Sequence, residues 1–199
     1  VYRGMDIGTG KDLNSYVYKG KTIPYHLIDI ADPSEEYNVS RFQKDFQCAF
    51  SVIRNRNKMP LLCGGTGFYI KAVLMDFKLS TVGPDKKLRQ QLETWTLKNL
   101  IQKLDNISPG LSMKIPIDTK RRVIRAIEIA LSRVNNKGKS NLVKNKFKTP
   151  LVLGVNYPRQ IIRDKITTRL HERFENGMIE EVECLIQNGV THERLDNLG

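Results

Sequence analysis

A glycine-rich turn, Gly64-Gly65-Thr66-Gly67, lies between a short apolar run and a segment that favours a helix. The apolar run Leu61–Cys63 is bounded by Pro60 and predicts a buried strand of a parallel sheet. The glycines allow the backbone to bend sharply and to approach a ligand closely. The following helix would point its free N–H groups at the turn. The stretch therefore predicts a phosphate site, although a tight strand-to-helix connection without a ligand explains the same pattern.

Two standard nucleotide-binding motifs do not fit this chain. A dinucleotide fingerprint starting at Gly65 lacks its third glycine. The nearest candidate for a P-loop, Gly10-Lys11, is followed by Asp12 where that motif requires Ser or Thr. The loop at residues 1–11 nevertheless carries Thr9 and Lys11, which can serve an anionic ligand.

The positive charge of the chain is concentrated in one segment. The net charge is +12, and residues 78–149 hold 17 Lys and Arg against 5 Asp and Glu. The remaining 127 residues hold 16 of each sign, so the excess belongs to the segment alone. A neutral body with one basic segment is typical of a protein that binds a polyanion through that segment. A solvated lysine-rich insert is the alternative explanation.

Predicted strands and helices alternate on both sides of the basic segment. Strands are expected at residues 24–30, 59–63 and 150–155. Amphipathic helices are expected at residues 39–57, 159–176 and 178–187. Asn38 or Ser40 can cap the first, in which Phe42, Phe46 and Phe50 recur at helical spacing. The second is expected to face inward with Ile162, Ile166, Leu170 and Phe174. Alternation of this kind indicates an α/β fold with a parallel sheet, in which ligands bind beyond the carboxyl ends of the strands.

The basic segment itself is predicted to be all helical. Asp85 can cap a helix that runs to about residue 104, and Asp118 or Thr119 can cap a second one over residues 120–134. Basic residues crowd the first turns of the second helix, where they oppose the helix dipole. An anionic partner would offset that cost, whereas a solvated face is the alternative. Residues 135–148 read as a linker. The expected division is therefore 1–77, 78–149 and 150–199, with the basic helical insertion splitting the α/β core.

Composition excludes several other classes of protein. No run approaches the ~20 apolar residues of a membrane span, so we expect no membrane contact. The three cysteines, Cys48, Cys63 and Cys184, form no C-x-x-C pair, and the three histidines lack metal-ligand spacing. These features predict a cytoplasmic protein without structural zinc, and we expect a monomer.

Five blocks of residues give the chain a likeness to a known family. In order they are Tyr2-x-Gly4-Met5-Asp6-Ile7-Gly8-Thr9-x-Lys11, Pro24-x-His26-Leu27-Ile28-Asp29, Gly64-Gly65-Thr66-Gly67-x-Tyr69, Arg122-Val123-Ile124-Arg125-Ala126-Ile127-Glu128, and Ile166-x-x-Arg169 with Gly177 and Glu181-Val182. Each block is weak alone. Together, with the basic insertion in the right place, they resemble the tRNA dimethylallyltransferases (tRNA isopentenyltransferases) over nearly the whole chain.

The resemblance implies a P-loop-kinase-like parallel sheet core and a helical insertion that grips the tRNA anticodon stem-loop. It implies transfer of a dimethylallyl group from dimethylallyl diphosphate to N6 of the adenosine just 3′ of the anticodon, with Mg2+. Thr66 would lie in the reaction channel and touch the target nucleotide, and Arg169 would contact the diphosphate. With the turn and loop above, the expected diphosphate-binding residues are Arg169, Gly64, Gly65, Gly67, Thr9 and Lys11. The expected tRNA-binding residues are Thr66, Arg89, Arg121, Arg122, Val123, Ile124 and Arg125.

The chain departs from the family pattern at its start, and the family's C-terminal helices are expected after Gly199. The family's P-loop and its proton-accepting aspartate are expected before Val1 and so are not among these residues. We therefore expect residues 1–199 alone to be inactive, although the protein that contains them is an enzyme. Three alternatives stay open: a cytokinin-type adenylate isopentenyltransferase, a non-catalytic RNA-binding module, and a small-molecule P-loop kinase. The basic insertion argues against the first, because a mononucleotide needs no such surface.

Overall fold

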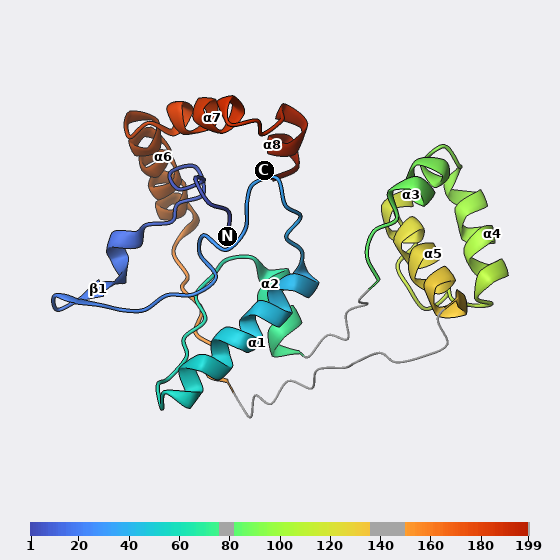
Figure 1. The fold of residues 1–199 in the computed structure, drawn as a ribbon, viewed down its shortest axis with the longest axis horizontal. Coiled ribbons are helices and arrows are strands. Elements are labelled where there is room, and N and C mark those ends of the chain that lie inside the picture. The colour runs from blue at the N-terminus through green and yellow to red at the C-terminus, as the bar shows by residue number, and fades with distance from the viewer. Residues whose placement is uncertain (76–81, 136–149, 199) are drawn as a thin grey trace. The chain divides into compact units, whose positions relative to one another are not determined.

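The computed structural model describes residues 1–75, 82–135 and 150–198. The chain separates into two compact units, one made of Val1–Asp76 with Asn145–Gly199 and the other of Phe77–Lys144 (Figure 1). Both boundaries expected from the sequence fall outside the described residues, as does the predicted linker after residue 135. No helix among the described residues is long and apolar enough to cross a membrane.

The described residues of the first unit form a short 3-10 helix, a two-stranded ribbon and five α-helices. In chain order these are η1 (Leu13–Tyr16), β1 (Val17–Tyr18), β2 (Lys21–Thr22), α1 (Val39–Asn55), α2 (Gly67–Leu74), α6 (Arg159–Glu175), α7 (Met178–Gln187) and α8 (His192–Leu198). The second unit holds α3 (Lys86–Glu93), α4 (Leu97–Ile107) and α5 (Lys120–Asn135). The helices predicted at residues 39–57, 159–176 and 178–187 are thus confirmed, while α8 was not predicted.

The second unit is a three-helix cluster in which α3 and α4 both pack against α5. Its core consists of the apolar stripes of these helices, namely Leu92, Leu100, Leu104, Val123, Ile124, Ile127 and Ala130. Asp85 caps α3 as predicted, since its carboxylate accepts a hydrogen bond of 3.0 Å from the Leu88 N–H. The single helix predicted up to residue 104 is wrong, because the chain breaks after α3 and Thr96 caps α4 by accepting from the Asn99 N–H at 3.3 Å.

In the first unit, α1 and α2 pack together through an aromatic contact. The rings of Phe42 on α1 and Tyr69 on α2 lie 4.8 Å apart between centroids. The Gln43 side-chain amide of α1 donates to the Ala72 carbonyl of α2 at 2.7 Å. Asn38 caps α1 as predicted, by accepting hydrogen bonds from the first turn. This pair of helices places the start of α2, and with it the glycine-rich turn, beside α1.

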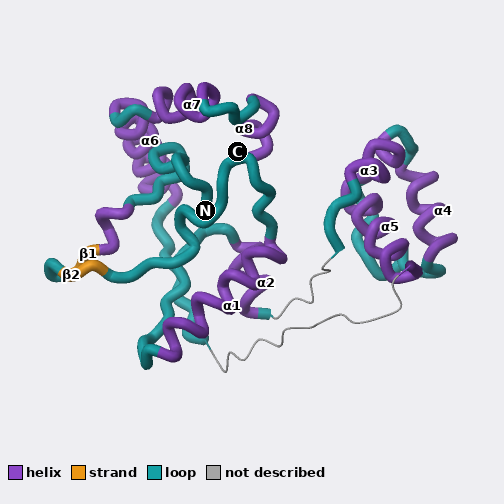
Figure 2. The backbone as a smooth tube through the Cα atoms, in the orientation of Figure 1, coloured by secondary structure: helices purple, strands orange, loops and turns teal. Residues whose placement is uncertain are grey.

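The predicted parallel sheet is not present in the described part of the chain. The strands there form only the antiparallel ribbon β1–β2, in which Val17 pairs with Thr22 (Figure 2). Residues 59–63 and 150–155 form no strand and are exposed; Leu61 is 74% and Leu153 is 82% exposed. Residues 24–30 also form no strand, because Leu27 adopts a positive φ of 65° there. An apolar segment becomes a strand only beside a partner strand. Among the described residues the only such pairing near these three segments is a single parallel bridge between Tyr2 and Ala31, just after the first of them, and residues 59–63 and 150–155 have none.

The α6 helix forms at the predicted position, but its apolar face is not buried. Ile162, Ile166, Leu170 and Phe174 recur at helical spacing and were expected to point inward. All four are exposed in the structure, and Ile166 is 60% exposed. The prediction of a buried face on α6 was wrong for the same reason as the predicted sheet. No described element packs on this side of the helix.

Candidate functional site

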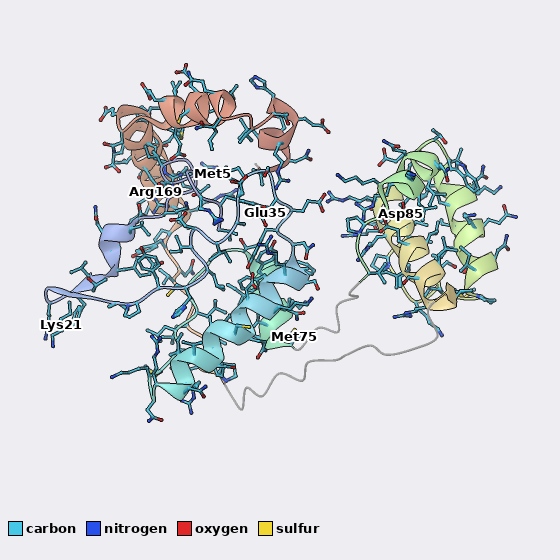
Figure 3. The ribbon with its side chains drawn as sticks, viewed as in Figure 1. Met5, Lys21, Glu35, Met75, Asp85 and Arg169 are labelled. Atoms are coloured by element: carbon cyan, nitrogen blue, oxygen red, sulfur yellow. The ribbon has the colours of Figure 1, made fainter. Side chains whose placement is uncertain are left out.

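An open hollow of about 280 Å3 lies between the loop at residues 6–13 and the helix α6. The loop forms one wall, and α6 contributes Arg169, Glu172 and Arg173 to the other, together with its C-cap residue Asn176. In Figure 3 the labelled Met5, just before the loop, and Arg169 on α6 lie near one another. The structure therefore brings together two sets of predicted site residues that are far apart in the sequence.

Arg169 is the cation in this hollow that is best placed for a ligand. Its side chain is exposed, and it forms no hydrogen bond or ion pair with any residue that the structure describes. It also borders a second open hollow on α6, beside Lys165, whose ammonium group lies 4.5 Å from the centre of the Tyr157 ring. A guanidinium group offers several N–H donors in a fixed plane, which suits the oxygens of a phosphate.

Lys11 and Thr9 are already satisfied within the protein. The Lys11 ammonium group donates to the Tyr2 carbonyl and the Asp6 carboxylate, both at 2.5 Å, and also to the Asp29 carboxylate. Burial lowers the pKa of Lys11, but its bonds to Asp29 and Asp6 outweigh burial, so the pKa is raised. Thr9 donates its hydroxyl hydrogen to the Met5 carbonyl. In this structure neither side chain presents a free donor to an anion, and the binding of diphosphate by these two residues stays a prediction.

The turn at residues 64–67 is open, and its glycines are not required by the backbone. Gly65 and Gly67 have no positive φ, and a Cβ atom added at either would meet no atom within 4 Å. The chain does bend at Gly65, but without a backbone conformation that only glycine adopts readily. Thr66 is exposed at the start of α2, where its carbonyl accepts from the N–H groups of Tyr69 and Ile70 at 3.0 and 3.2 Å. The turn does not line the hollow at Arg169.

Two of the predicted tRNA-binding arginines serve a buried carboxylate in the second unit. Arg89 donates from Nε and Nη2 to the two Glu128 oxygens at 2.7 and 2.9 Å. Arg125 donates from Nη1 to Glu128 at 2.9 Å and from Nη2 to the Val82 carbonyl at 2.6 Å. Burial raises the pKa of Glu128, but the bonds from Arg89 and Arg125 more than compensate and lower it to about 2. Arg89 and Arg125 thus have a structural role that sequence reasoning missed.

The other predicted residues of α5 divide into core and surface. Val123 and Ile124 are buried at 0% and 3% exposure, so the RNA contact predicted for them would have to come from their backbone. Arg121 and Arg122 are exposed at the start of the helix, and Arg122 forms an ion pair with Asp118 at 2.5 Å. The helix period explains the division, because positions 123, 124 and 127 share the face that packs on α4.

Sequence reasoning also missed the contacts of Glu181 and Arg173 with the N-terminal loop. Glu181 accepts hydrogen bonds from the backbone N–H groups of Asp6, Ile7 and Gly8. These contacts join residues more than 170 positions apart, so no local pattern could have revealed them. The available signals were that Glu181 belongs to the fifth family block and that Arg173 follows Arg169 by one helical turn.

Comparisons with known proteins give a consistent result. The family model described as "IPP transferase" matches residues 1–199. The tRNA dimethylallyltransferase 2 of Shewanella sediminis is 41% identical over 199 residues, which is 100% of this chain and 64% of that protein. The tRNA dimethylallyltransferase 2 of Bacteroides fragilis is 41% identical over 197 residues, or 98% of this chain and 63% of that protein. The chain thus spans less than two thirds of the length of these relatives.

Solved structures agree with the sequence relatives. The full-length tRNA isopentenylpyrophosphate transferase of Bacillus halodurans aligns with a TM-score of 0.57 at 33% identity, covering 96% of this chain and 60% of that one. A eukaryotic dimethylallyltransferase solved acting on tRNA aligns with a TM-score of 0.62 over 87% of this chain and 46% of that one. At 23% identity, the second likeness shows the fold alone. The family model and the relatives together establish that the chain belongs to the IPP transferase family.

Proposed function

We propose that the protein containing this chain transfers a dimethylallyl group from dimethylallyl diphosphate to N6 of the tRNA adenosine just 3′ of the anticodon. The bond between the allylic carbon and the diphosphate oxygen breaks, and its electron pair leaves with the diphosphate. N6 forms the new bond to that carbon and gives up a proton to a base. The family match over residues 1–199 is the observation that carries the proposal.

The hollow at Arg169 supports the diphosphate part of the proposal. An unpaired, exposed guanidinium can stabilise the negative charge that grows on the diphosphate as the C–O bond breaks. The open turn supports the acceptor part, because the space beside Gly65 and Gly67 leaves room for a nucleotide and the Thr66 hydroxyl is exposed there. An adenine reaches such a site only after it is turned out of the RNA stack.

The charge of the second unit supports RNA as the partner. Residues 82–135 hold 11 Lys and Arg against 5 Asp and Glu. Lys120, Arg121 and Arg122 follow one another at the N-terminus of α5, where the helix dipole adds positive potential. Phosphate contacts of this kind position a nucleic acid without reading its sequence. Recognition of an anticodon stem-loop by this surface is part of the proposal.

Magnesium also belongs to the proposal for the whole protein. The described residues contain no group of three or more His, Cys, Asp or Glu side chains that could hold a metal ion. Two nearby carboxylates, Asp6 and Asp29, are occupied by Lys11. Mg2+ can also be held by one or two carboxylates together with the phosphates of a substrate, and no step above passes through the ion. A cytoplasmic, monomeric enzyme likewise remains a prediction.

The direct test uses the intact protein with dimethylallyl diphosphate, Mg2+ and an anticodon stem-loop, followed by mass analysis of the digested nucleosides. Dimethylallyl-adenosine is the expected product, and AMP offered in place of RNA should not be modified. Arg169→Ala should lower the rate about 100-fold. Arg163→Ala is the matched control, since Arg163 is an exposed arginine of α6 outside the hollow, and it should retain activity. Product from AMP alone, or salt-sensitive RNA binding without any product, would contradict the proposal.

A further inference from the structure

The Glu181 carboxylate is held by three consecutive backbone N–H groups of the N-terminal loop. Asp6 and Ile7 each donate to Oε2 at 2.7 Å, and Gly8 donates to Oε1 at 3.0 Å. Consecutive N–H groups that converge in this way form an anion-binding concavity of the backbone. A charged acceptor with several donors gives stronger bonds than a neutral one, so this contact fixes the loop firmly.

Arg173 holds the same loop from α6. Its Nη1 donates to the Gly8 carbonyl at 3.2 Å. A Cβ atom added at Gly10, which has a φ of 66°, would lie 2.2 Å from Arg173 Nη2. The guanidinium group therefore lies directly against the loop at a position where a glycine makes room for it.

The corner between α6 and α7 brings these two side chains to one loop. Gly177 has a φ of 92° and turns the chain between the end of α6 and the start of α7. Glu181 lies in the first turn of α7, where its N–H donates to the Gly177 carbonyl at 3.0 Å. Arg173 lies in the last turn of α6. Thus α6 holds the loop through the Gly8 carbonyl, and α7 holds it through the backbone N–H groups of residues 6–8.

The loop held in this way is one wall of the hollow, and Arg169 stands on the other wall. Arg169 and Arg173 are separated by one turn of α6. A contact that holds the loop against Arg173 therefore also fixes the distance between the loop and Arg169. Neither Glu181 nor Arg173 needs to touch a ligand to have this effect.

We propose that Glu181 and Arg173 are positioning residues, which clamp residues 6–10 against α6 and so set the width of the anion site at Arg169. The inference rests on the proposed function for the identity of the anion, a diphosphate. The clamp itself can be tested without the reaction. The alternative is a contact that only stabilises the fold, which would leave the anion affinity unchanged.

The first experiment measures binding of inorganic pyrophosphate to the intact protein by calorimetry. Glu181→Gln should weaken binding about tenfold, because the amide loses the charge that attracts three N–H donors. Glu183→Gln removes the same charge from an exposed position of α7 and should leave binding unchanged. Equal affinity of the two variants would overturn the proposal. Tighter binding by Glu181→Gln would overturn it too, because the carboxylate would then be competing for the anion site.

A double-mutant cycle separates positioning from general destabilisation. In a protein that already carries Arg169→Ala, the effect of Glu181→Gln on pyrophosphate affinity should shrink to about twofold or less, because the clamp acts through Arg169. An unchanged tenfold effect would contradict that route. Arg173→Lys provides a second variant that keeps the charge but loses the guanidinium, and it should weaken binding in the same direction.

Two further measurements keep this inference distinct from the proposed function. Amide hydrogen exchange at Asp6, Ile7 and Gly8 should accelerate in Glu181→Gln but not in Glu183→Gln, and unchanged exchange would refute the clamp. In the transferase assay, Glu181→Gln should raise KM for dimethylallyl diphosphate and not KM for the RNA. A wild-type protein that forms no product would refute the proposed function alone, since pyrophosphate binding and amide exchange would still test the clamp.

Discussion

Arg89 on α3 and Glu128 on α5 form a two-point ion pair, with Nε to Oε1 at 2.7 Å and Nη2 to Oε2 at 2.9 Å. The carboxylate also accepts from Arg125 at 2.9 Å and from the Asp85 N–H at 2.9 Å. Its side chain is only 1% exposed, whereas Arg89 and Arg125 are 38% and 33% exposed. One buried acid therefore joins the start of α3 to the middle of α5, and it holds two arginines that keep partial access to solvent.

Glu128→Gln should destabilise the second unit. The amide removes the charge and turns an acceptor oxygen into a donor facing two guanidinium groups, at a cost of about 2–3 kcal/mol. Urea unfolding of the intact chain, followed by the fluorescence of Trp95, would measure the change. Glu93→Gln on α3 is the control, because Glu93 is exposed, and it should cost about 0.5 kcal/mol or less. Similar values for both variants would show that the ion pair contributes no net stability.

The same carboxylate predicts a dependence of stability on pH. Its pKa is about 2 in the folded protein against an ordinary value of 4.5, so the unfolded chain binds more protons between these values. The stability from Glu128 is therefore complete above pH 4.5 and is lost as the pH falls towards 2. The difference in free energy of unfolding between wild type and Glu128→Gln should shrink over that interval. A constant difference from neutral pH down to acid would contradict the low pKa.

Arg121→Ala should weaken RNA binding without lowering stability. Arg121 is exposed at the start of α5 and makes no ion pair with a described residue. Loss of one phosphate contact should reduce the slope of log affinity against log salt by about 1. Filter binding of an anticodon stem-loop at several salt concentrations would measure this. Lys98→Ala on α4 removes an exposed charge elsewhere in the unit and should leave the slope unchanged.

Gly67→Ala at the open turn should lower transfer activity without lowering stability. The added Cβ meets no atom within 4 Å and the backbone φ is not positive, so the folded state accommodates it. Alanine at the first position of α2 should even stabilise the helix, by up to about 1 kcal/mol. Transfer activity should nevertheless fall, because the space would be needed by the nucleotide. Gly154→Ala, also with open space, is the control and should keep full activity.

Gly10→Ala should be more costly than Gly20→Ala, although both glycines have a positive φ of 66° and 72°. The backbone strain of about 1 kcal/mol is common to both substitutions. At Gly10 the methyl group would also displace the Arg173 guanidinium and break its bond to the Gly8 carbonyl. Thermal unfolding should show the extra loss at Gly10, and Arg173→Ala should abolish that difference. If the difference persists without Arg173, the close approach is not its cause.

Local patterns predicted the helices of this chain because their signals lie within a few residues. The apolar spacing of Phe42, Phe46 and Phe50 predicted α1, and the caps Asn38 and Asp85 were both found in place. The break between α3 and α4 was missed, since the capping residue Thr96 lies inside a continuous apolar pattern. The family itself was predicted from five short blocks of residues and is confirmed over residues 1–199.

The strands and the roles of the charged residues depended on partners far away in the chain. Leu61 and Leu153 have the composition of buried strands, but pairing is a contact between distant segments, and the described residues provide no neighbour for either. The charge of Arg89 was visible in the sequence, whereas its bond to buried Glu128, 39 positions away, follows from how α3 packs on α5. The Lys11 ammonium group likewise forms an ion pair with Asp29, which lies 18 positions away. Helix formation and net charge are properties of local sequence, while the availability of a charge to a ligand is decided by tertiary neighbours that desolvate it or pair with it.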